Sequence, residues 1–575
     1  MPHRTDTPES RDSLAAARQW KLPFARWVPG YQRAWLASDG VAGVTLAAFA
    51  IPVSLAYATL AGLPPHYGIY CYLLGGLAYA LIGTSRQLAI GPTSALAMLV
   101  GTTVAGLAEG DPARWAGIAA LTALVVAAVC ALAWLLRLSS LMSFVSETIL
   151  LGFKAGAALT IALTQLPKLF GVAGGGEYFF ERLWILGGQI PGTNLIVLTF
   201  GLTALALLLA GDKLLPGKPV ALGVVVLSIV VMSLTSLSEY GLKIVGELPQ
   251  GLPALNWPSL RLRDVDGVIP LAFACFLLSY IESVSAARTL AAKNGYEVDP
   301  RQELLGLSAA NFAVAFGQGF PVAGGLSQSA VNDKAGAKSP LALVIASVTL
   351  AVCLQFLTGL LKNLPTVVLA SVVLVAVRGL IDIQAMRRLR QVSRREFRIS
   401  MVALMGVLLL GILKGVLLAA IVSLLILISA AARPHVAFLG RIPGSRRFSD
   451  IERHPDNETV PGVLIFRVEA SLLYFNVDHV RSVVWERIRA APPLQFVICD
   501  LSNSPIVDVA GARMLSSLST ELAQQGMHLR LVEAHSQNRD LLRAEGLEEQ
   551  VGHLGRHLSV EQAITECAQQ CPLPS

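Results

Sequence analysis

The chain has 575 residues, of which 54% are hydrophobic and only 14% are charged. Ordinary soluble proteins carry about 25% charged residues, so this composition excludes them and indicates a protein that lies mostly within a membrane. Charged residues are sparse between about residue 40 and residue 432 and become dense from Arg433 onward. This shift in composition predicts a membrane domain followed by a soluble domain.

The net charge of +7 and the seven cysteines bear on possible partners. Basic residues lie in the N-terminal arm and in loops between apolar runs, where they set the orientation of a membrane protein, so we expect no nucleic-acid partner. The cysteines are scattered, without a CxxC pair or a histidine cluster at metal spacing. We therefore expect no disulfide framework, no metal site and no cofactor.

Residues 1–38 form a polar and basic N-terminal arm that contains Trp20, Trp27 and Trp35. The arm lacks the apolar stretch and the small-residue cleavage site of a signal peptide. We expect it to remain on the chain as a cytoplasmic arm whose tryptophans lie at the membrane interface.

Apolar runs close to the roughly 20 residues needed to cross a bilayer follow the arm in succession. Twelve such runs lie at about residues 41–61, 67–84, 113–137, 147–170, 193–211, 219–237, 267–290, 303–320, 339–361, 365–380, 398–412 and 414–432. Two further segments, at about residues 90–108 and 326–337, contain Gly, Ser or Thr and are opened by Gly-Pro and Gly-Gly dipeptides. We count them as interrupted spans 3 and 10, which gives fourteen predicted spans.

The two interrupted spans hold matching positions, third in the first seven spans and third in the second seven. A repeat of seven spans inserts its second copy with opposite topology, so the pattern predicts an inverted repeat. Interrupted helices in such proteins meet near the bilayer midplane, where their N-termini attract anions. The alternative is that Gly and Pro only kink ordinary spanning helices; the matched positions favour an anion-binding site.

An even number of spans places both chain termini on one side of the membrane. The loops on that side contain more lysine and arginine than the opposite loops, including a cluster of Arg387, Arg388, Arg390, Arg394, Arg395 and Arg398. The positive-inside rule therefore predicts cytoplasmic N- and C-termini in a multi-pass protein of the inner cell membrane, with membrane lipid around it.

The residues after the last span alternate short apolar runs with helical stretches. We predict strands within residues 463–476, 495–501 and 528–534, and helices at about 478–491, 509–525 and from 538 onward. This order is typical of a small α/β domain. The predicted domains are the arm at 1–38, a transmembrane domain at 39–432, a linker at 433–459 and the α/β domain at 460–575.

Four long stretches of the membrane domain resemble signatures of the sulfate permease (SulP) family of anion transporters. They are IPVSLAYATLAGLPPHYGIY (51–70), GFKAGAALTIALTQLPKLFG (152–171), IESVSAARTLAAKNGYEVDPRQELLGLSAANF (281–312) and GFPVAGGLSQSAVNDKAGA (319–337). The tail resembles the C-terminal STAS domain of that family, with DLSNSPIVDVAG (500–511) as its recognisable loop. The resemblance covers nearly the whole chain.

The resemblance implies a polytopic α-helical membrane protein with fourteen spans in a seven-plus-seven inverted repeat and a cytoplasmic STAS-like α/β domain. Spans 1–4 and 8–11 would form a core that carries the substrate, and spans 5–7 and 12–14 would form a gate. It also implies a homodimer and elevator-like alternating access, in which the core slides against the gate. The sequence contains no P-loop, so we expect secondary transport and no enzyme activity.

The same resemblance implies an anion pocket where spans 1, 3 and 10 meet. Its residues would be Val53, Tyr57, Thr93, Ser94, Ser327, Gln328 and Ser329. Hydroxyl and backbone N–H groups there would replace the hydration of a small anion. The alternatives are that the serines and the threonine only cap helix ends and that Tyr57 packs in the interior, whereas Val53 offers only an apolar wall.

Two positions depart from many family members, because Val53 replaces a glutamine and Gln328 replaces an arginine. A fixed positive charge is therefore missing from the predicted pocket. Glu282 is the one acidic residue in its apolar run, and some relatives use an acidic residue there to bind sodium or a proton. An intramembrane carboxylate is costly, so we predict that Glu282 couples a proton or sodium ion to the anion. The alternative is a structural salt bridge with Arg288 or Lys154.

Three further residues are given other roles. Glu303, near the cytoplasmic end of span 9, is predicted to make an interfacial contact. In the STAS-like loop, Ala510 occupies the place of the serine that is phosphorylated in bacterial anti-anti-sigma relatives, so no phosphoryl switch is expected there. Asp508 is expected to cap the following helix. The tail would then act in folding, trafficking, modulation of transport or binding of a cytoplasmic protein partner.

The resemblance makes sulfate the leading substrate, with bicarbonate and a dicarboxylate such as fumarate or succinate as alternatives. A membrane-anchored anion sensor, in which the tail signals to a partner, is the alternative from a different class. A nucleobase permease of the same architecture is disfavoured because such relatives lack the C-terminal domain. The choice of anion, the coupling ion, and exchange against symport stay open on these grounds.

Overall fold

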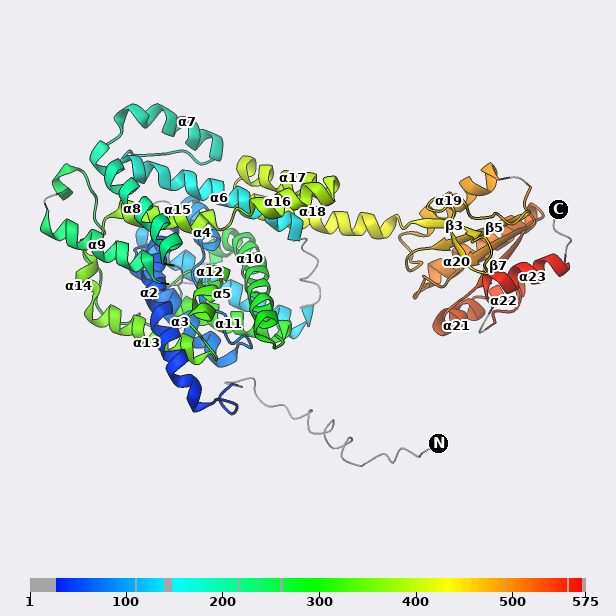
Figure 1. Ribbon diagram of the computed structural model, residues 1–575, viewed down its shortest axis with the longest axis horizontal. Helices are drawn as coiled ribbons and strands as arrows, with labels where there is room; N and C mark the ends of the chain where they lie inside the picture. Colours follow the sequence, from blue (N-terminus) through cyan, green and yellow to red (C-terminus); the bar gives the residue numbers. More distant parts are fainter. Residues whose placement is uncertain are drawn as a thin grey trace. The chain divides into compact units, whose positions relative to one another are not determined.

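The computed structural model describes residues 27–108, 111–138, 147–215, 218–235, 237–258, 262–491, 493–555 and 558–570. Contacts divide the chain into two compact units, Met1–Ser423 and Leu424–Ser575. The first unit consists mainly of helices, and the second contains a sheet flanked by helices (Figure 1). Residues 1–26 of the predicted N-terminal arm lie outside the described residues.

The helical unit repeats one order of elements twice. The first half contains α2 (Leu36–Leu60), α3 (His66–Ile82), β1 (Ile90–Gly91), α4 (Ser94–Ala108), α5 (Pro112–Leu135), α6 (Glu147–Phe170), α7 (Phe179–Gln189), α8 (Leu195–Leu214) and α9 (Val220–Leu234). The second half contains α10 (Leu262–Asn294), α11 (Pro300–Phe316), β2 (Ala323–Gly324), α12 (Leu326–Lys334), α13 (Leu341–Phe356), the single turn α14 (Thr358–Leu361), α15 (Thr366–Arg378), α16 (Ile383–Val392), α17 (Arg394–Leu410) and α18 (Ile412–Ala432). The 3₁₀ helices are η2 (Arg33–Trp35), η4 (Ile190–Gly192) and η5 (Leu237–Tyr240). Apart from α14, and from α7 and α16, which occupy the same place in the two halves and lie outside the predicted spans, this order agrees with the predicted seven-plus-seven repeat.

Seven helical segments in the described part of the chain are long and apolar enough to cross a membrane. They are Arg33–Leu60, Arg114–Leu135, Thr148–Phe170, Leu195–Leu214, Asp266–Asn294, Thr366–Val392 and Ile412–Ala432. Four shorter apolar helices, α3, α4, α9 and α13, add to them. Each predicted span overlaps a helix, and the number of helices that cross the membrane stays a prediction.

Several helices begin at a residue whose side chain accepts hydrogen bonds from otherwise free backbone N–H groups. Asn194 caps α8 by accepting from two such groups. Asp299 does the same at α11, where Pro300 follows as the first helical residue. Ser393 caps α17. Each cap stabilises its helix by about 1 kcal/mol and helps to fix where the helix begins.

The helices of this unit pack in two groups. In one, α11 packs against α3 and α5, α13 against α2 and α3, and α10 against α4, α5 and α12. In the other, α6 packs against α15 and α17, and α8 against α9 and α15. These groups match the predicted core and gate, so we call α2–α5 and α10–α13 the core helices, and α6–α9 and α15–α17 the gate helices. We count α18 with the gate helices from its place in the predicted repeat; the boundary between the two units falls within it. They meet where α2 contacts α9 and α15 and where α4 contacts α6.

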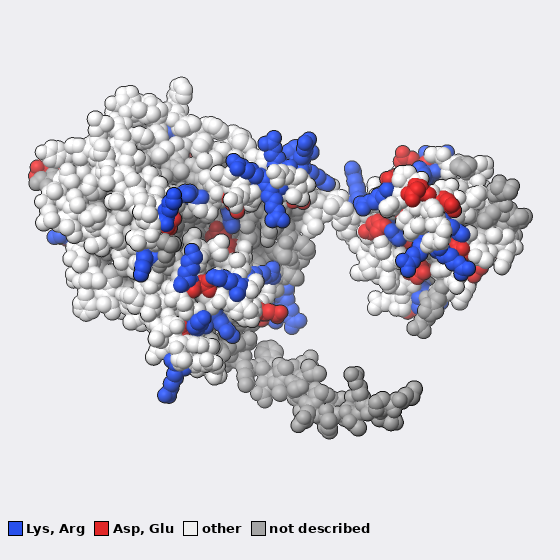
Figure 2. Space-filling view, viewed as in Figure 1, with Lys and Arg blue, Asp and Glu red and all other residues white. Residues whose placement is uncertain are grey.

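Exposed arginines gather along α16 and the start of α17. They are Arg387, Arg388, Arg390, Arg394, Arg395 and Arg398. Figure 2 shows lysine and arginine side chains crowded over this part of the helical unit. In the predicted orientation the cluster lies at the cytoplasmic surface, where anionic lipid head groups attract basic residues.

The second unit contains a five-stranded sheet in the order β4-β3-β5-β6-β7. The strands are β3 (Val436–Arg441), β4 (Phe448–Asp450), β5 (Val463–Val468), β6 (Phe496–Asp500) and β7 (His528–Val532). The last three strands run parallel, whereas β3 is antiparallel to both of its neighbours. The helices are α19 (Val477–Ala490), α20 (Val509–Gln524), α21 (Ser536–Ala544), α22 (Leu547–Val551) and α23 (Val560–Gln570).

Helices cover both faces of this sheet. Alternate residues of a strand point to opposite faces, so Phe466 belongs to the apolar cluster formed with α19–α22, and Ile465 to the cluster formed with α23. The predicted order of strands and helices is confirmed, with boundaries that agree within a few residues in most places. The first strand ends earlier than predicted, at Val468, and the last predicted helix is divided into α21, α22 and α23. Asp508 caps α20 by accepting from the N–H of Gly511, as predicted.

The predicted linker at residues 433–459 is wrong, because it contains two strands of the sheet. β3 pairs with β5, where Phe438 lies opposite Phe466, and β4 extends the edge beyond β3. The run is short and follows an apolar span directly, so its apolar residues did not stand out as a strand. Its partner lies about thirty residues further along the chain, a distance that local patterns do not cover.

Truncation after Arg433 should leave a folded, membrane-inserted helical unit with reduced or altered transport. The large apolar cluster of the helical unit ends at Ile412, and the clusters of the sheet begin at Val436, so each of these clusters is formed by residues of one unit. Size-exclusion chromatography of the solubilised variant should give one symmetric peak. Loss of membrane insertion would contradict this expectation.

Truncation after residue 459 is the matched control. That variant keeps β3 and β4 but lacks β5, so the pairing groups of β3 and the apolar side chains beside it become exposed. Unpaired strand edges promote aggregation. The variant truncated after residue 459 should therefore aggregate more than the variant truncated after Arg433. If residues 433–459 were only a flexible linker, the two variants would aggregate equally.

Candidate functional site

The two predicted interrupted spans meet at a pair of two-residue strands. β1 pairs with β2 in antiparallel register, with Ile90 opposite Gly324 and Gly91 opposite Ala323. α4 begins three residues after β1, and α12 begins two residues after β2. The pairing therefore brings the N-terminal ends of two short helices from the two halves of the unit to one place.

Glycine permits this close crossing. A side-chain carbon on Gly91 would lie 2.3 Å from the ring of Tyr72, and one on Gly324 would lie 2.7 Å from the side chain of Leu88. Real contacts of this kind do not occur at these distances, so a larger residue would have to displace Tyr72 or Leu88 from the crossing. The Gly-Pro and Gly-Gly dipeptides thus open the interrupted spans for a steric reason.

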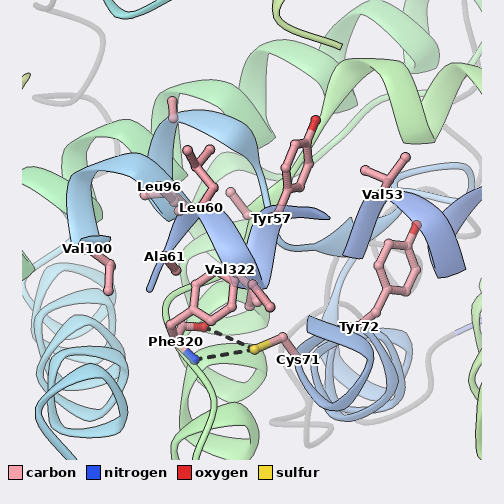
Figure 3. Close-up of a cluster of buried hydrophobic side chains, with 14 of the residues drawn as sticks. Val53, Tyr57, Leu60, Ala61, Cys71, Tyr72, Leu96, Val100, Phe320 and Val322 are labelled. Carbon is pink, nitrogen blue, oxygen red and sulfur yellow. Dashed lines mark hydrogen bonds between the residues drawn. The ribbon is translucent and has the colours of Figure 1, made fainter. Parts of the chain in front are cut away.

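Neighbouring core helices hold the second strand in place. Ser283 of α10 accepts a hydrogen bond from the N–H of Gly324 at 2.7 Å. Asn311 of α11 accepts from the N–H of Val322 at 3.0 Å and donates to its carbonyl at 3.2 Å. Cys71 of α3 contacts the backbone N–H and carbonyl of Phe320 (Figure 3). These buried groups satisfy backbone that is outside any helix, as membrane burial requires.

Gln328 and Ser329 fasten the two interrupted spans together. The Oγ of Ser329 accepts from the N–H of Ala89 at 2.9 Å and donates to the carbonyl of Gly325 at 2.7 Å. The side-chain amide of Gln328 donates to the carbonyl of Ala89 at 3.1 Å. Both side chains are buried. Ser327, between Gly325 and Gln328, is exposed instead, and it is the side chain of this trio best placed to meet a ligand.

The remaining predicted pocket residues lie on α2 and at the start of α4. Val53 and Tyr57 are buried one turn apart on α2 (Figure 3), and Tyr57 lies close to Ser94. Thr93 and Ser94 are also buried. The Oγ1 of Thr93 has no hydrogen-bond partner among the described residues. An unpartnered buried hydroxyl is the feature expected of a group that awaits a ligand.

Glu282 extends from α10 toward the same place. It lies close to Thr93 and within electrostatic range of Tyr57 and of Lys154 on the gate helix α6. The side chain is partly buried, and its Oε2 has no hydrogen-bond partner within the described chain. The alternative salt bridge with Lys154 or Arg288 is not formed between these described residues. Tyr57, Thr93, Ser94 and Glu282 therefore form one polar cluster.

Glu303 has a different position from the predicted interfacial contact. Its carboxylate is fully buried and accepts from the hydroxyls of Tyr79 at 2.7 Å and Thr84 at 2.6 Å. It also accepts from the backbone N–H groups of Thr84 at 2.9 Å and Ser85 at 3.3 Å. Glu303 thus holds the turn that follows α3. The sequence hid this role because its partners lie more than 200 residues away.

Sequence reasoning missed Cys71, Ser283 and Asn311, which hold the interrupted second strand. The latter two fall within the stretch 281–312, whose resemblance to the family was noted without roles for single residues. Both are polar residues within apolar helices, and that contrast was the available signal. Cys71 carried no such signal, because a free cysteine in an apolar run is indistinguishable from a small core residue.

These features define a class: a multi-span helical membrane protein in which two interrupted helices meet, followed by a small α/β domain. The sequence model of the sulfate permease family matches residues 36–403, and the STAS domain model matches residues 454–563. The chain therefore belongs to the sulfate permease family and carries a STAS domain. The members of this family are transporters, so the protein is a transporter rather than an enzyme.

Relatives and solved structures agree with this assignment. A probable sulfate transporter of Mycobacterium tuberculosis is 33% identical over 92% of this chain and 96% of the relative. The chloroplastic sulfate transporter 4.1 of Arabidopsis thaliana is 29% identical over 95% of this chain and 82% of its own. The murine Solute Carrier 26 family member A9 anion transporter, solved in the inward-facing state, shares the fold with a TM-score of 0.87, at 22% identity over 99% and 96% of the two chains.

The transmembrane domain of a cyanobacterial bicarbonate transporter, BicA, matches 69% of this chain and 98% of its own length with a TM-score of 0.58 and 21% identity. At such identities the solved structures show the shared architecture of the helical unit. Together with family membership, the relatives support a multi-pass membrane protein that transports an anion.

Proposed function

We propose that the protein is a secondary active transporter that carries sulfate across the inner cell membrane by elevator-like alternating access. One observation supports this most directly: the β1–β2 crossing places two helix N-termini and a cluster of hydroxyls together in the core helices. Helix N-termini carry partial positive charge and free N–H groups, which bind anions. The named sulfate transporters among its relatives favour sulfate over other anions.

The proposed cycle moves the polar cluster with the core helices. Ser94, Ser327 and Tyr57 would replace part of the hydration of the anion, while Gln328 and Ser329 keep the two helix starts at a fixed separation. Glu282 would take up a proton or a sodium ion before a second negative charge comes near, so that each ion favours binding of the other. The gate helices would stay in place, within a homodimer whose chain termini lie in the cytoplasm.

Uptake into proteoliposomes tests the proposal. Labelled sulfate, bicarbonate and fumarate are offered to the purified protein with and without inward proton or sodium gradients. Gradient-driven accumulation of sulfate would support coupled sulfate transport. Accumulation of only bicarbonate or fumarate would replace the substrate, and no uptake of any anion under every gradient would favour the anion-sensor alternative.

Bicarbonate is the second candidate, and the pocket itself favours it over a dicarboxylate. Gln328 stands where many relatives carry an arginine, and its amide is engaged with the carbonyl of Ala89. A fixed cation would attract an anion with two charges more strongly than an anion with one. Its absence therefore weakens binding of a monovalent anion less than binding of a divalent anion. The bicarbonate transporter among the similar folds agrees with this reasoning.

Gln328→Arg should shift selectivity toward divalent anions. The added charge would lie between the two helix N-termini, and it attracts a divalent anion about twice as strongly as a monovalent one. We expect the ratio of sulfate to bicarbonate kcat/KM to rise about tenfold, which corresponds to about 1.4 kcal/mol. Gln328→Met, which removes the hydrogen bond to Ala89 without adding charge, is the control and should leave this ratio unchanged.

A further inference from the structure

A second polar region lies away from the crossing, in a cleft of about 800 Å³ between core and gate helices. Its core side includes Thr59 at the end of α2 and Thr102 on α4. Its gate side carries three cations, Lys168 of α6, Arg182 of α7 and Lys414 of α18. The residues of the predicted anion pocket do not line this cleft.

The positive charge of the cleft is only partly offset. Arg182 donates from its Nε to the carbonyl of Gly176 at 3.0 Å and interacts electrostatically with Glu177 and Glu181. Lys168 and Lys414 are exposed, and neither forms an ion pair with any residue that the structure describes. Glu177 is the one carboxylate among the described lining residues. The gate side of the cleft therefore presents two uncompensated cations.

The cleft adjoins the predicted pocket along two core helices. Met98, which lines the cleft, follows Ser94 by one turn of α4, and Leu60 follows Tyr57 on α2. The hydroxyl of Thr102 donates to the carbonyl of Met98 at 2.9 Å, and rotation of a hydroxyl frees it to donate to a ligand. An anion in the cleft would therefore lie about one helical turn from the polar cluster of the core helices.

We propose that this cleft is an entry site that captures the transported oxyanion through Lys168 and Lys414 before it reaches the pocket. The proposal rests on the proposed function and adds a binding site to it. Two cations in a recess raise the local concentration of anions, and the pocket, which has no fixed cation among its predicted residues, then receives an anion that its side chains attract weakly. In this arrangement the fixed positive charges lie on the gate helices, and the hydroxyl groups lie on the core helices, which move.

The entry site is expected to open toward the outside of the cell. Lys168 lies in the last turn of α6, and Lys414 lies in the first turn of α18. In the predicted orientation the last turn of α6 and the first turn of α18 both lie on the side away from the cytoplasm. The entry site should therefore affect capture from the outside and leave capture from the inside unchanged.

Transport kinetics give the first test. In Lys168→Met, Lys414→Met and the double variant, the KM for external sulfate should rise roughly two- to threefold per charge removed at low ionic strength, with kcat unchanged. Lys414→Arg should restore the wild-type KM. Lys362→Met, an exposed lysine outside the lining of the cleft, is the matched control. A double variant with wild-type KM, or with KM raised equally from both sides, would overturn the proposal.

A second test does not depend on transport. Thr102→Cys places a thiol in the cleft, and its labelling rates with an anionic and a cationic membrane-impermeant thiol reagent are compared. The native cysteines of the described residues are buried, and the unsubstituted chain gives the background. The anionic-to-cationic rate ratio should fall roughly two- to threefold when Lys414→Met is added, and added sulfate should slow the anionic reagent.

The two tests separate failure of this proposal from failure of the proposed function. A wild-type protein that takes up no anion, yet shows the charge-dependent labelling ratio, would remove the transport proposal and keep the anion site. Wild-type uptake together with a labelling ratio that does not change when Lys168 or Lys414 is replaced would remove the anion site and keep the transport proposal. Labelling of Thr102→Cys only from the cytoplasmic side would overturn the assigned direction.

Discussion

Replacement of Glu303 by alanine is expected to destabilise the helical unit by about 3–5 kcal/mol. The carboxylate accepts four hydrogen bonds from Tyr79, Thr84 and Ser85, and it is fully buried. Each donor left without a partner in a buried place costs about 1–3 kcal/mol. The turn after α3 would lose its anchor to α11, so the effect should spread through the core helices.

Thermal unfolding of the purified protein in detergent measures this effect. Glu303→Gln keeps one acceptor oxygen and the shape of the side chain, so its loss should be smaller than that of Glu303→Ala. Glu297→Ala removes an exposed carboxylate from the preceding loop, and it should change stability by less than about 0.5 kcal/mol. Equal midpoints for Glu303→Ala and Glu297→Ala would show that the buried network contributes little.

Glu282→Gln is expected to leave the fold intact and abolish coupling. The Oε2 of Glu282 accepts no hydrogen bond from the described residues, so an amide of the same shape removes no contact of that atom. A difference of one pH unit stores 1.36 kcal/mol per proton, which drives at most about tenfold accumulation with one proton per anion. In the variant, accumulation should fall from this level to equality of inside and outside concentrations, while downhill flux continues.

The measurement is steady-state accumulation in proteoliposomes under imposed proton and sodium gradients. Glu282→Asp, which retains the charge, should keep part of the coupling and serves as the matched variant. If accumulation by Glu282→Gln depended on the proton and sodium gradients as in the wild type, the coupling hypothesis would be wrong. Comparison with Glu303→Gln separates the two carboxylates of the core helices, since we expect Glu282→Gln to change coupling without stability and Glu303→Gln to change stability without coupling.

Much of the site was predictable because its signals are local. The dipeptides at Gly91 and Gly324 marked the places where two helices are interrupted, and the structure brings these places together. Glu282 stood out as a carboxylate in an apolar run, because burial of a charge is expensive wherever the helix packs. Thr93 and Ser94 were placed at the start of a helix, and α4 does begin at Ser94.

Other roles could not be predicted from the sequence because they depend on partners far along the chain. Gln328 and Ser329 resembled ligands in sequence, and the structure engages both with the backbone of Ala89, more than 230 residues away. The strand β3 resembled a linker because its partner β5 follows only after a long connection. The cations of the cleft come from three separate gate helices, and nothing local connects Lys168 with Lys414.

The sequence by itself determined that the protein is a multi-span membrane transporter with an α/β tail, because hydrophobicity, helix interruption and family motifs are written in contiguous residues. Only the tertiary structure decided which polar side chains are engaged with backbone and which remain available to an ion. The physical reason is that most buried polar groups are hydrogen-bonded, so the few in the described chain that are not, such as the Oγ1 of Thr93, stand out only once all the partners are known. In this fold the partners come from opposite halves of the chain.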